Sequence, residues 1–133
     1  MTYKRHNIGR AGEYLVAAML SQIADTVIIV PHASSSDIIL EYQDKLYRCQ
    51  VKTKSKFEKQ RLNWRFDLRR SSRKDRKYYE NEIEIFGLAN LMYRNVIFIK
   101  NEDEKNISQI TITDEHMKNN DPVKNFLNLI EAE

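Results

Sequence analysis

Four polar side chains stand at positions where a helix or a strand built only for stability would not need them. Glu13 lies among the apolar turns of an expected helix, and Asp37 opens an expected strand directly after three serines. Gln50 and Lys52 are two residues apart on the next expected strand, so they share one face about 7 Å apart. A hairpin between these two strands would bring Asp37 close to both, and a helix packed across the sheet could aim Glu13 at the same point. The spacing therefore predicts one cluster drawn from three segments.

These residue types suit metal-assisted hydrolysis of a phosphodiester bond. Glu13 and Asp37 offer hard oxygen ligands for Mg²⁺, an ion that keeps several waters and needs only one or two protein carboxylates. The side-chain carbonyl of Gln50 and the backbone carbonyl of Val51 are further candidate ligands. The metal would lower the pKa of a bound water, and Lys52 would orient that water and offset charge that develops on the phosphate. We expect Mg²⁺ at this cluster, with Mn²⁺ as a substitute.

Each member of the cluster has an ordinary structural role when it is considered singly. Glu13 would be a surface helix residue, Asp37 would cap a turn after the serines, and Gln50 and Lys52 would face solvent on an edge strand. Only their combination, in this order, favours a nuclease-type site.

The histidines and the cysteine point to no second chemistry. His6, His32 and His116 are too scattered for a ligand set, and we interpret them as structural, with His32 the nearest to the cluster. Cys49 faces away from Gln50 on the alternating strand, which is typical of a small buried hydrophobic residue. A single cysteine also excludes an internal disulfide framework and a multi-cysteine zinc site.

One segment carries most of the positive charge. The 133 residues have a net charge of +3, but residues 48–77 contain 13 basic and 3 acidic residues and have a net charge of +10. The remainder contains 9 basic and 16 acidic residues and has a net charge of −7. Such asymmetry favours a polyanion partner, most simply double-stranded DNA, over a merely solvated face. The cations expected to contact DNA are Arg48, Lys54, Lys56, Arg69, Arg70, Arg73, Lys74, Arg76 and Lys77.

Composition predicts one intracellular domain spanning residues 1–133. A hydrophobic fraction of 41% with 10% aromatic residues supplies a core. No apolar run approaches the roughly 18 residues of a membrane-spanning helix, and the basic N-terminus leads into no signal-type apolar region. We therefore expect a protein of the cytoplasm or nucleoid that is neither secreted nor bound to a membrane.

The hydrophobic pattern predicts a helix, a run of strands and a final helix. The first helix falls within residues 1–25, with Asn7 as its cap, and a short basic helix could begin at Ser72. The last helix begins at Asp121–Pro122. Strands are expected over residues 26–31, 37–42, 46–53, 62–68, 82–86, 96–99 and 107–113. This order indicates a mixed α/β or α+β domain.

The spacing resembles the PD-(D/E)XK nuclease superfamily. Ser36-Asp37-Ile-Ile-Leu40 followed by Gln50-Val-Lys52 is similar to its core motif, with Glu13 in the place of the upstream helix glutamate. The likeness extends over roughly residues 9–100, and the segment Arg69-Arg-Ser-Ser-Arg73 is similar to the group I intron homing endonuclease branch. Archaeal-type Holliday junction resolvases are also similar.

The resemblance implies an α/β fold with a restriction-endonuclease-like core, in which α-helices flank a mixed central β-sheet. It assigns Glu13 and Asp37 to the metal and Gln50 and Lys52 to catalysis, and it implies Mg²⁺ dependence and an oligomer that cuts both strands. Two residues depart from the motif. Ser36 replaces the usual proline, and Gln50 replaces the usual acidic residue, as in the homing branch. The loss of one negative ligand at Gln50 should weaken metal binding without abolishing activity.

The sequence thus predicts a metal-dependent DNA endonuclease, most like a site-specific homing endonuclease. One site per 15.8 kDa subunit requires a homodimer or homotetramer to cut a duplex. Three alternatives remain open: a structure-selective nuclease that resembles junction resolvases, a catalytically inactive DNA-binding module of the same fold, and a nuclease whose substrate is RNA.

Overall fold

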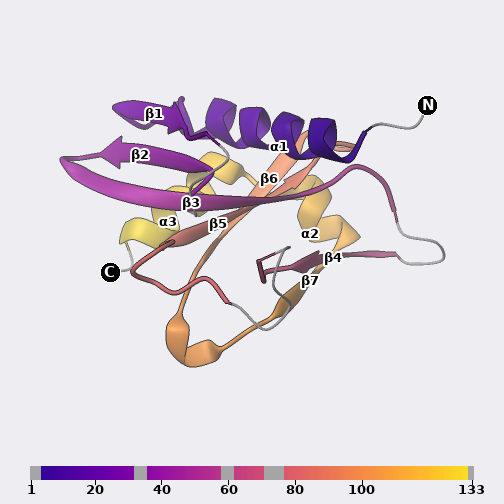
Figure 1. The fold of residues 1–133 in the computed structure, drawn as a ribbon. Coiled ribbons are helices and arrows are strands. Elements are labelled where there is room, and N and C mark those ends of the chain that lie inside the picture. Colours follow the sequence, from indigo (N-terminus) through magenta and orange to yellow (C-terminus); the bar gives the residue numbers. More distant parts are fainter. Residues whose placement is uncertain (1–3, 32–35, 58–61, 71–76, 132–133) are drawn as a thin grey trace.

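A five-stranded mixed sheet forms the centre of the protein (Figure 1). The computed structural model describes residues 4–31, 36–57, 62–70 and 77–131. The strands lie in the order β1-β2-β3-β5-β6; β3 and β5 are parallel, and the other neighbours are antiparallel. Their bounds are β1 (Thr26–Ile29), β2 (Ile38–Tyr42), β3 (Lys45–Lys54), β5 (Ile85–Asn90) and β6 (Asn95–Lys100).

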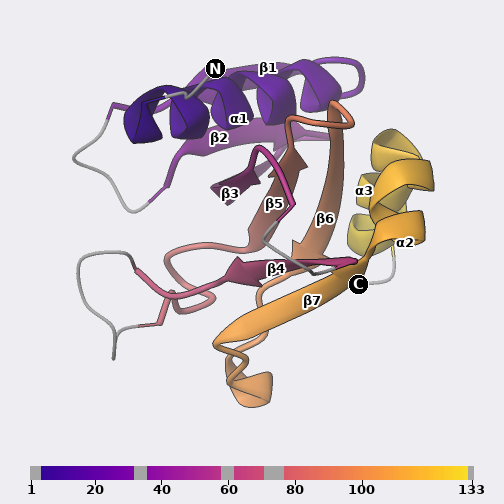
Figure 2. The same cartoon turned by 90° about the vertical axis from the view of Figure 1, so that its right-hand side faces the viewer.

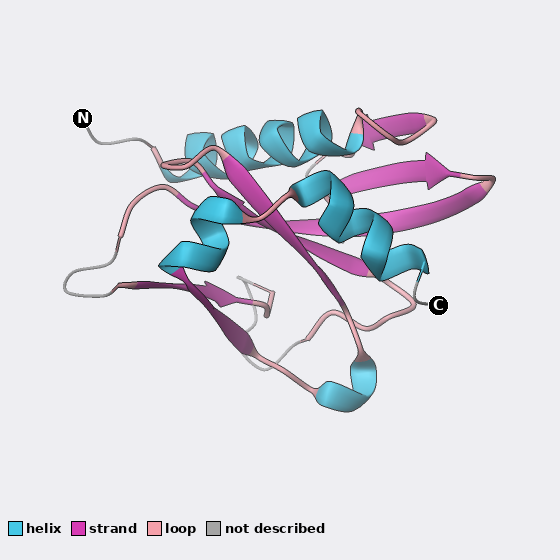
Figure 3. Cartoon of the chain, turned by 180° about the vertical axis from the view of Figure 1, so that it is seen from behind, coloured by secondary structure: helices cyan, strands magenta, loops and turns pink. Residues whose placement is uncertain are grey.

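Different elements cover the two faces of this sheet. Helices α1 (Arg5–Leu20) and α3 (Pro122–Glu131) pack on one face, around a core that includes Val16, Leu40 and Phe126. A two-stranded antiparallel ribbon of β4 (Asn63–Asp67) and β7 (Gln109–Thr113) covers the other face together with α2 (Asp114–Asn119). Figure 2 shows α1 and the ribbon on opposite sides of the sheet, and Figure 3 shows α2 and α3 from behind. The short 3-10 helix η1 (Asp103–Lys105) joins β6 to β7.

The alternation of β3 divides its side chains between the two cores. Cys49 and Val51 face α1, and both are buried. Gln50 and Lys52 point the opposite way, beside Phe86 and Leu88 of β5, toward the ribbon. The predicted shared face of Gln50 and Lys52 is therefore confirmed.

The β2–β3 hairpin fixes where the open edge of β3 begins. Its two turn residues, Gln43 and Asp44, have φ values of 49° and 64°, as a two-residue hairpin turn with right-handed strand twist requires. Pairing proceeds from this turn to Ile38, which lies opposite Cys49. Because β2 begins at Ile38, the half of β3 that holds Lys52 has no β2 strand beside it.

The expected mixed α/β architecture is confirmed, three local expectations are wrong, and one helix was not expected. Asn7 does not cap α1, because the helix begins at Arg5 and Asn7 instead accepts a hydrogen bond from Arg10 Nη2 at 3.1 Å. The strand expected over residues 82–86 begins at Ile85, because the N–H groups of residues 82 and 83 close a turn onto the carbonyl of Tyr79. Helix α2 was not expected. The strand expected over residues 26–31 ends at residue 29.

The basic helix expected from Ser72 lies outside the described residues. Within the described part of the chain, no helix has both the length and the apolar run that a bilayer crossing requires.

Candidate active site

The site lies where β2 begins and the edge of β3 becomes open. The backbone N–H of Asp37 donates to the carbonyl of Cys49 at 3.0 Å, and the N–H of Val51 donates to Asp37 Oδ2 at 2.9 Å. The side chain of Asp37 thus occupies a position on β3 that a further β2 residue would otherwise take. In a strand, the N–H and C=O of one residue point to the same side. The carbonyl of Val51 is therefore directed toward the side of β3 on which Asp37 lies.

Glu13 reaches the same edge because α1 approaches β3 unusually closely. A Cβ atom built on Gly12 would lie 1.8 Å from Thr53 Oγ1 and 2.8 Å from both Thr53 Cβ and Cγ2. Only glycine permits this approach. Because Glu13 follows Gly12 directly, the contact places its carboxylate beside the second half of β3.

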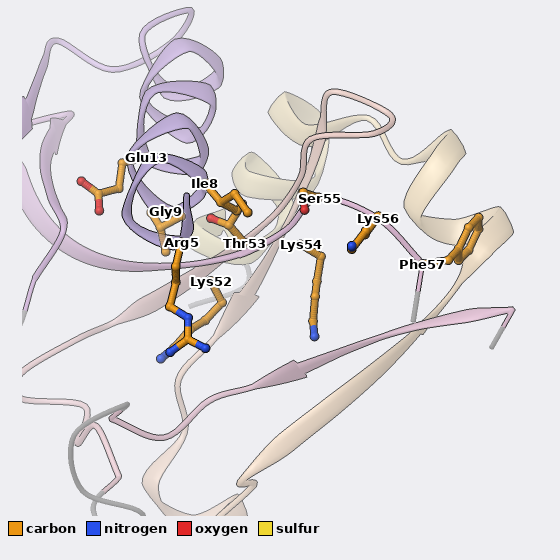
Figure 4. Close-up of a pocket in the computed structure, with 11 residues that line it drawn as sticks. Arg5, Ile8, Gly9, Glu13, Lys52, Thr53, Lys54, Ser55, Lys56 and Phe57 are labelled. Atoms are coloured by element: carbon orange, nitrogen blue, oxygen red, sulfur yellow. The ribbon is translucent and has the colours of Figure 1, made fainter. Parts of the chain in front are cut away.

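Glu13 and Lys52 line one pocket of about 800 Å³ (Figure 4). Figure 4 shows the Glu13 carboxylate extending to the left of α1, while the side chains of Lys52, Lys54 and Arg5 extend below β3. The residues that line the pocket are Arg5, Ile8, Gly9, Glu13, Val51, Lys52, Thr53, Lys54, Ser55, Lys56 and Phe57.

Lys52 is held in a partly buried position between the sheet and the end of β4. Its Nζ donates to the carbonyl of Arg69 at 2.8 Å and lies 5.2 Å from the ring centroid of Tyr78. Burial lowers the pKa of Lys52, while the negative charges of Asp37 and Asp67 act in the opposite direction. Asp37 contacts the backbone of Val51, the residue directly before Lys52.

Tyr78 lies beside Lys52 and Arg70. It is buried, and the guanidinium of Arg70 lies 4.4 Å from its ring centroid. Burial raises the pKa of the Tyr78 hydroxyl, and the negative charge of Asp37 adds to this effect. Tyr78 therefore supports the cations of the site rather than offering its ring to a nucleic-acid base.

The donors at this edge fit a hard cation that retains water ligands. Among the described residues, no three His, Cys, Asp or Glu side chains lie close enough to hold a metal by themselves. The predicted oxygen ligands do not all meet in the pocket: Glu13 and Val51 line it, whereas Asp37 and Gln50 do not. Asp37 is joined to this edge through the N–H of Val51, and Gln50, which is 9% exposed, points toward the ribbon beside Phe86. Carboxylate, carbonyl and water ligands suit Mg²⁺ and Mn²⁺ and do not suit soft metals.

The predicted DNA-contacting cations fall into two groups. Lys54 and Lys56 line the pocket. Four others that the structure describes are held by acidic side chains or carbonyls: Arg48 pairs with Glu84 at 2.6 Å, Arg69 with Asp67 at 2.9 Å, Arg70 with Glu82, and Lys77 Nζ donates to the carbonyl of Asp103 at 2.9 Å. Arg48 lies on the ribbon side of β3, where its Nε and Nη2 atoms both donate hydrogen bonds to the carboxylate of Glu84. We therefore interpret Arg48 as a structural residue.

Four predicted residues lie outside the described part of the chain: Arg73, Lys74, Arg76 and His32. Conversely, sequence reasoning missed Arg5, an exposed cation at the start of α1 that lines the pocket. The pair of basic residues Lys4 and Arg5 at the start of the helix that carries Glu13 was the available signal.

No protein-family model matches the chain, and no curated protein matches it in sequence. Among solved structures, the bacterial homing endonuclease I-Ssp6803I is similar, with a TM-score of 0.69 and 16% sequence identity. The alignment covers 98% of this chain and 94% of that chain. The likeness therefore extends over nearly all of both chains, and what the two share is the fold: a mixed α/β architecture built on a five-stranded sheet.

Proposed function

We propose that this chain is a metal-dependent endonuclease of the PD-(D/E)XK type that hydrolyses phosphodiester bonds in duplex DNA, most like a homing endonuclease. One observation carries the proposal: Asp37, fixed by the N–H of Val51, acts electrostatically on the partly buried amine of Lys52, which shares a pocket with Glu13. The full-length likeness to a homing endonuclease supports the same conclusion.

In this proposal the residues of the site have separate roles in metal binding and in catalysis. Asp37 and Glu13, with the carbonyl of Val51 and the side chain of Gln50, would hold Mg²⁺ or Mn²⁺. When bound, the ion supplies Lewis-acid polarisation of the phosphate and a more acidic water. Lys52 donates a hydrogen bond toward the attacking water and opposes the negative charge that develops on the phosphate oxygens.

The pocket cations would hold the DNA backbone on either side of the cut. Lys54 and Lys56 continue from Lys52 along the chain, and Arg5 faces the same pocket from α1. Each phosphate that they neutralise releases counterions, so binding weakens steeply as salt rises. One chain carries one site, so a double-strand cut requires a homodimer or homotetramer. The superfamily resemblance implies a 5′ phosphate and a 3′ hydroxyl on the product.

The test is incubation with a randomised duplex DNA pool and Mg²⁺, followed by sequencing of cleaved ends. We expect cleaved ends, their loss in EDTA, and a fall of about 10²- to 10⁴-fold in rate for Lys52→Ala with little change in binding. Lys56→Ala is the matched control, because it should weaken binding and leave the rate at saturating DNA nearly unchanged. Equal rates for wild type and Lys52→Ala would refute the catalytic assignment.

A second candidate function is a DNA-binding module without turnover. Gln50 stands where an acidic residue is usual in the motif, and the described residues offer no trio of metal-binding side chains. This alternative predicts that wild type and Lys52→Ala both bind DNA and that neither cleaves in Mg²⁺ or Mn²⁺. Including four-way junctions in the substrate panel distinguishes a junction-selective nuclease, which would cleave these in preference to every linear duplex.

A further inference from the structure

The outward face of the β4–β7 ribbon is composed entirely of hydrogen-bonding side chains. Its inward residues, including Trp64, Phe66 and Ile112, are buried against the central sheet. The register then places the exposed residues in three cross-strand pairs. These pairs are Asn63 with Thr113, Arg65 with Thr111, and Asp67 with Gln109, and all six side chains are exposed.

This surface is preformed, because the ribbon is anchored on its inner side. Trp64 Nε1 donates to Asp114 Oδ1 at 3.0 Å, and the ring of Phe57 stacks on Trp64 with centroids 4.4 Å apart. Tyr93 packs edge-on against Trp64 and donates its own hydroxyl to Asp114 at 2.5 Å. Outward side chains on such a backbone keep fixed spacing, which recognition of a regular ligand requires.

The ribbon is also joined directly to the proposed active site. The carbonyl of Arg69, two residues beyond the end of β4, accepts the hydrogen bond from Lys52 Nζ at 2.8 Å. The guanidinium of Arg69 bonds to Asp67 on the outward face. A DNA phosphate bound at Lys52 would therefore also lie beside the end of the ribbon.

We infer that the β4–β7 ribbon enters the major groove of duplex DNA next to the cut and that its outward side chains read base edges. This inference rests on the proposed function. The major groove, about 12 Å wide, admits a two-stranded ribbon, and its base edges match these residue types. Arginine pairs with guanine, asparagine and glutamine pair with adenine, aspartate accepts from cytosine, and the threonine methyl contacts thymine.

The geometry favours B-form DNA over RNA as the ligand. A five-residue strand extends roughly 17 Å. At about 3.4 Å per base pair, that length spans about five base pairs. The major groove of an RNA helix is deep and too narrow for side chains to read. The ribbon should therefore contribute a short block of sequence preference on one side of the cut.

The first test measures sequence preference by binding alone. Full-length wild type, Arg65→Gln and Arg94→Gln are each incubated with a randomised duplex DNA pool in EDTA, and the bound duplexes are sequenced. Arg94 is the matched control, because it is an exposed arginine at the β5–β6 turn, outside the ribbon and the pocket. We expect Arg65→Gln to lose roughly tenfold to a hundredfold of the preference for guanine at one position. We expect Arg94→Gln to select the wild-type consensus.

The second test locates the contact in the groove. In the selected duplex, 7-deazaguanine replaces the guanine at the affected position and removes its major-groove N7 acceptor. Wild type should bind this duplex more weakly, and Arg65→Gln should bind both duplexes equally. Equal binding by wild type, or tight binding of an RNA duplex of the same sequence, overturns the inference.

The outcomes separate this inference from the proposed function. A protein that never cleaves, but whose selected consensus changes in Arg65→Gln, retains the ribbon readout and loses the nuclease assignment. A protein that cleaves at sites whose consensus is unchanged by Arg65→Gln, Asn63→Ala and Gln109→Ala retains the nuclease assignment and loses the readout. Because these three residues are exposed, unchanged thermal melting confirms that each variant is folded.

Discussion

Replacing Gly12 with alanine is the most direct perturbation of the contact that positions Glu13. The added methyl group would lie 1.8 Å from Thr53 Oγ1 and 2.8 Å from both Thr53 Cβ and Cγ2. Rotation of the Thr53 side chain moves Oγ1 and Cγ2 but leaves Cβ in place, so α1 must shift away from β3. Ordinary contact between carbon atoms requires about 3.5–4.0 Å, so this shift is on the order of 1 Å.

The expected loss of stability follows from two opposing contributions. Overpacking costs about 1–3 kcal/mol, and three contacts this short lead us to expect the upper end. Replacing a helical glycine with alanine recovers about 1 kcal/mol, so the free energy of unfolding should fall by about 2 kcal/mol. Gly9 is the matched control on the same helix, because nothing lies within 4 Å of a Cβ built there. Gly9→Ala should therefore raise the free energy of unfolding by about 0.5–1 kcal/mol.

Urea unfolding of the three proteins measures both changes, and they should have opposite signs. The melting temperature should fall by roughly 8 °C in Gly12→Ala and rise by roughly 3 °C in Gly9→Ala, at about 4 °C per kcal/mol for a chain of this size. In a Thr53→Ala background the loss caused by Gly12→Ala should shrink, because two of the three clashing atoms are gone. Gly12→Ala should also slow DNA cleavage by displacing Glu13. If Gly12→Ala is as stable as Gly9→Ala, α1 does not approach β3 as closely as described here.

Three further predictions concern ionisation. Hydrogen bonds from Arg69 hold the pKa of Asp67 at about 2, which is below the pKa of this aspartate in the unfolded chain. The stability that this pair adds to the fold is therefore present above pH 4 and is lost as the pH falls toward 2. Because the pair is exposed, that stability is small. NMR titration of Asp67 measures its pKa, and a value near that of an ordinary aspartate would contradict the pairing with Arg69. Burial lowers the pKa of Lys52, so cleavage should begin to fall at a pH below 10.5, the pKa of an ordinary lysine. A pH–rate profile in which cleavage falls only at or above pH 10.5 would contradict a role for the ammonium form of Lys52. Burial raises the pKa of the Cys49 thiol, so iodoacetamide at pH 8 should label this thiol only as fast as the protein unfolds. Rapid labelling of the native protein would show that Cys49 is not buried in β3 as described.

Period-two patterns in the sequence predicted the parts of the site that depend on a single strand. The alternation around Cys49 placed Gln50 and Lys52 together on the opposite face, and the structure confirms it. The turn at Gln43–Asp44 predicted the hairpin that brings Asp37 to this face. Both expectations rest on local geometry, which a strand pattern determines nearly completely.

Contacts between distant segments could not be predicted in the same way. Nothing in the pattern around Gly12 indicates that Thr53 lies against it, because that contact depends on how the helix crosses the sheet. The high positive charge of residues 48–77 likewise concealed that Arg48 is paired with Glu84, which lies 36 residues away. A count of charges detects an excess of cations but does not show which of them already have acidic partners.

The unequal lengths of β2 and β3 explain why the proposed chemistry is located at this edge. Strand β3 has ten residues and β2 has five, so no strand among the described residues pairs with the backbone of β3 beyond Cys49 on that side. An unpaired strand edge normally exposes backbone N–H and C=O groups. Here the carboxylate of Asp37 accepts the N–H of Val51 and, in doing so, is fixed beside Lys52. The same interaction thus satisfies a strand edge and orients a candidate metal ligand.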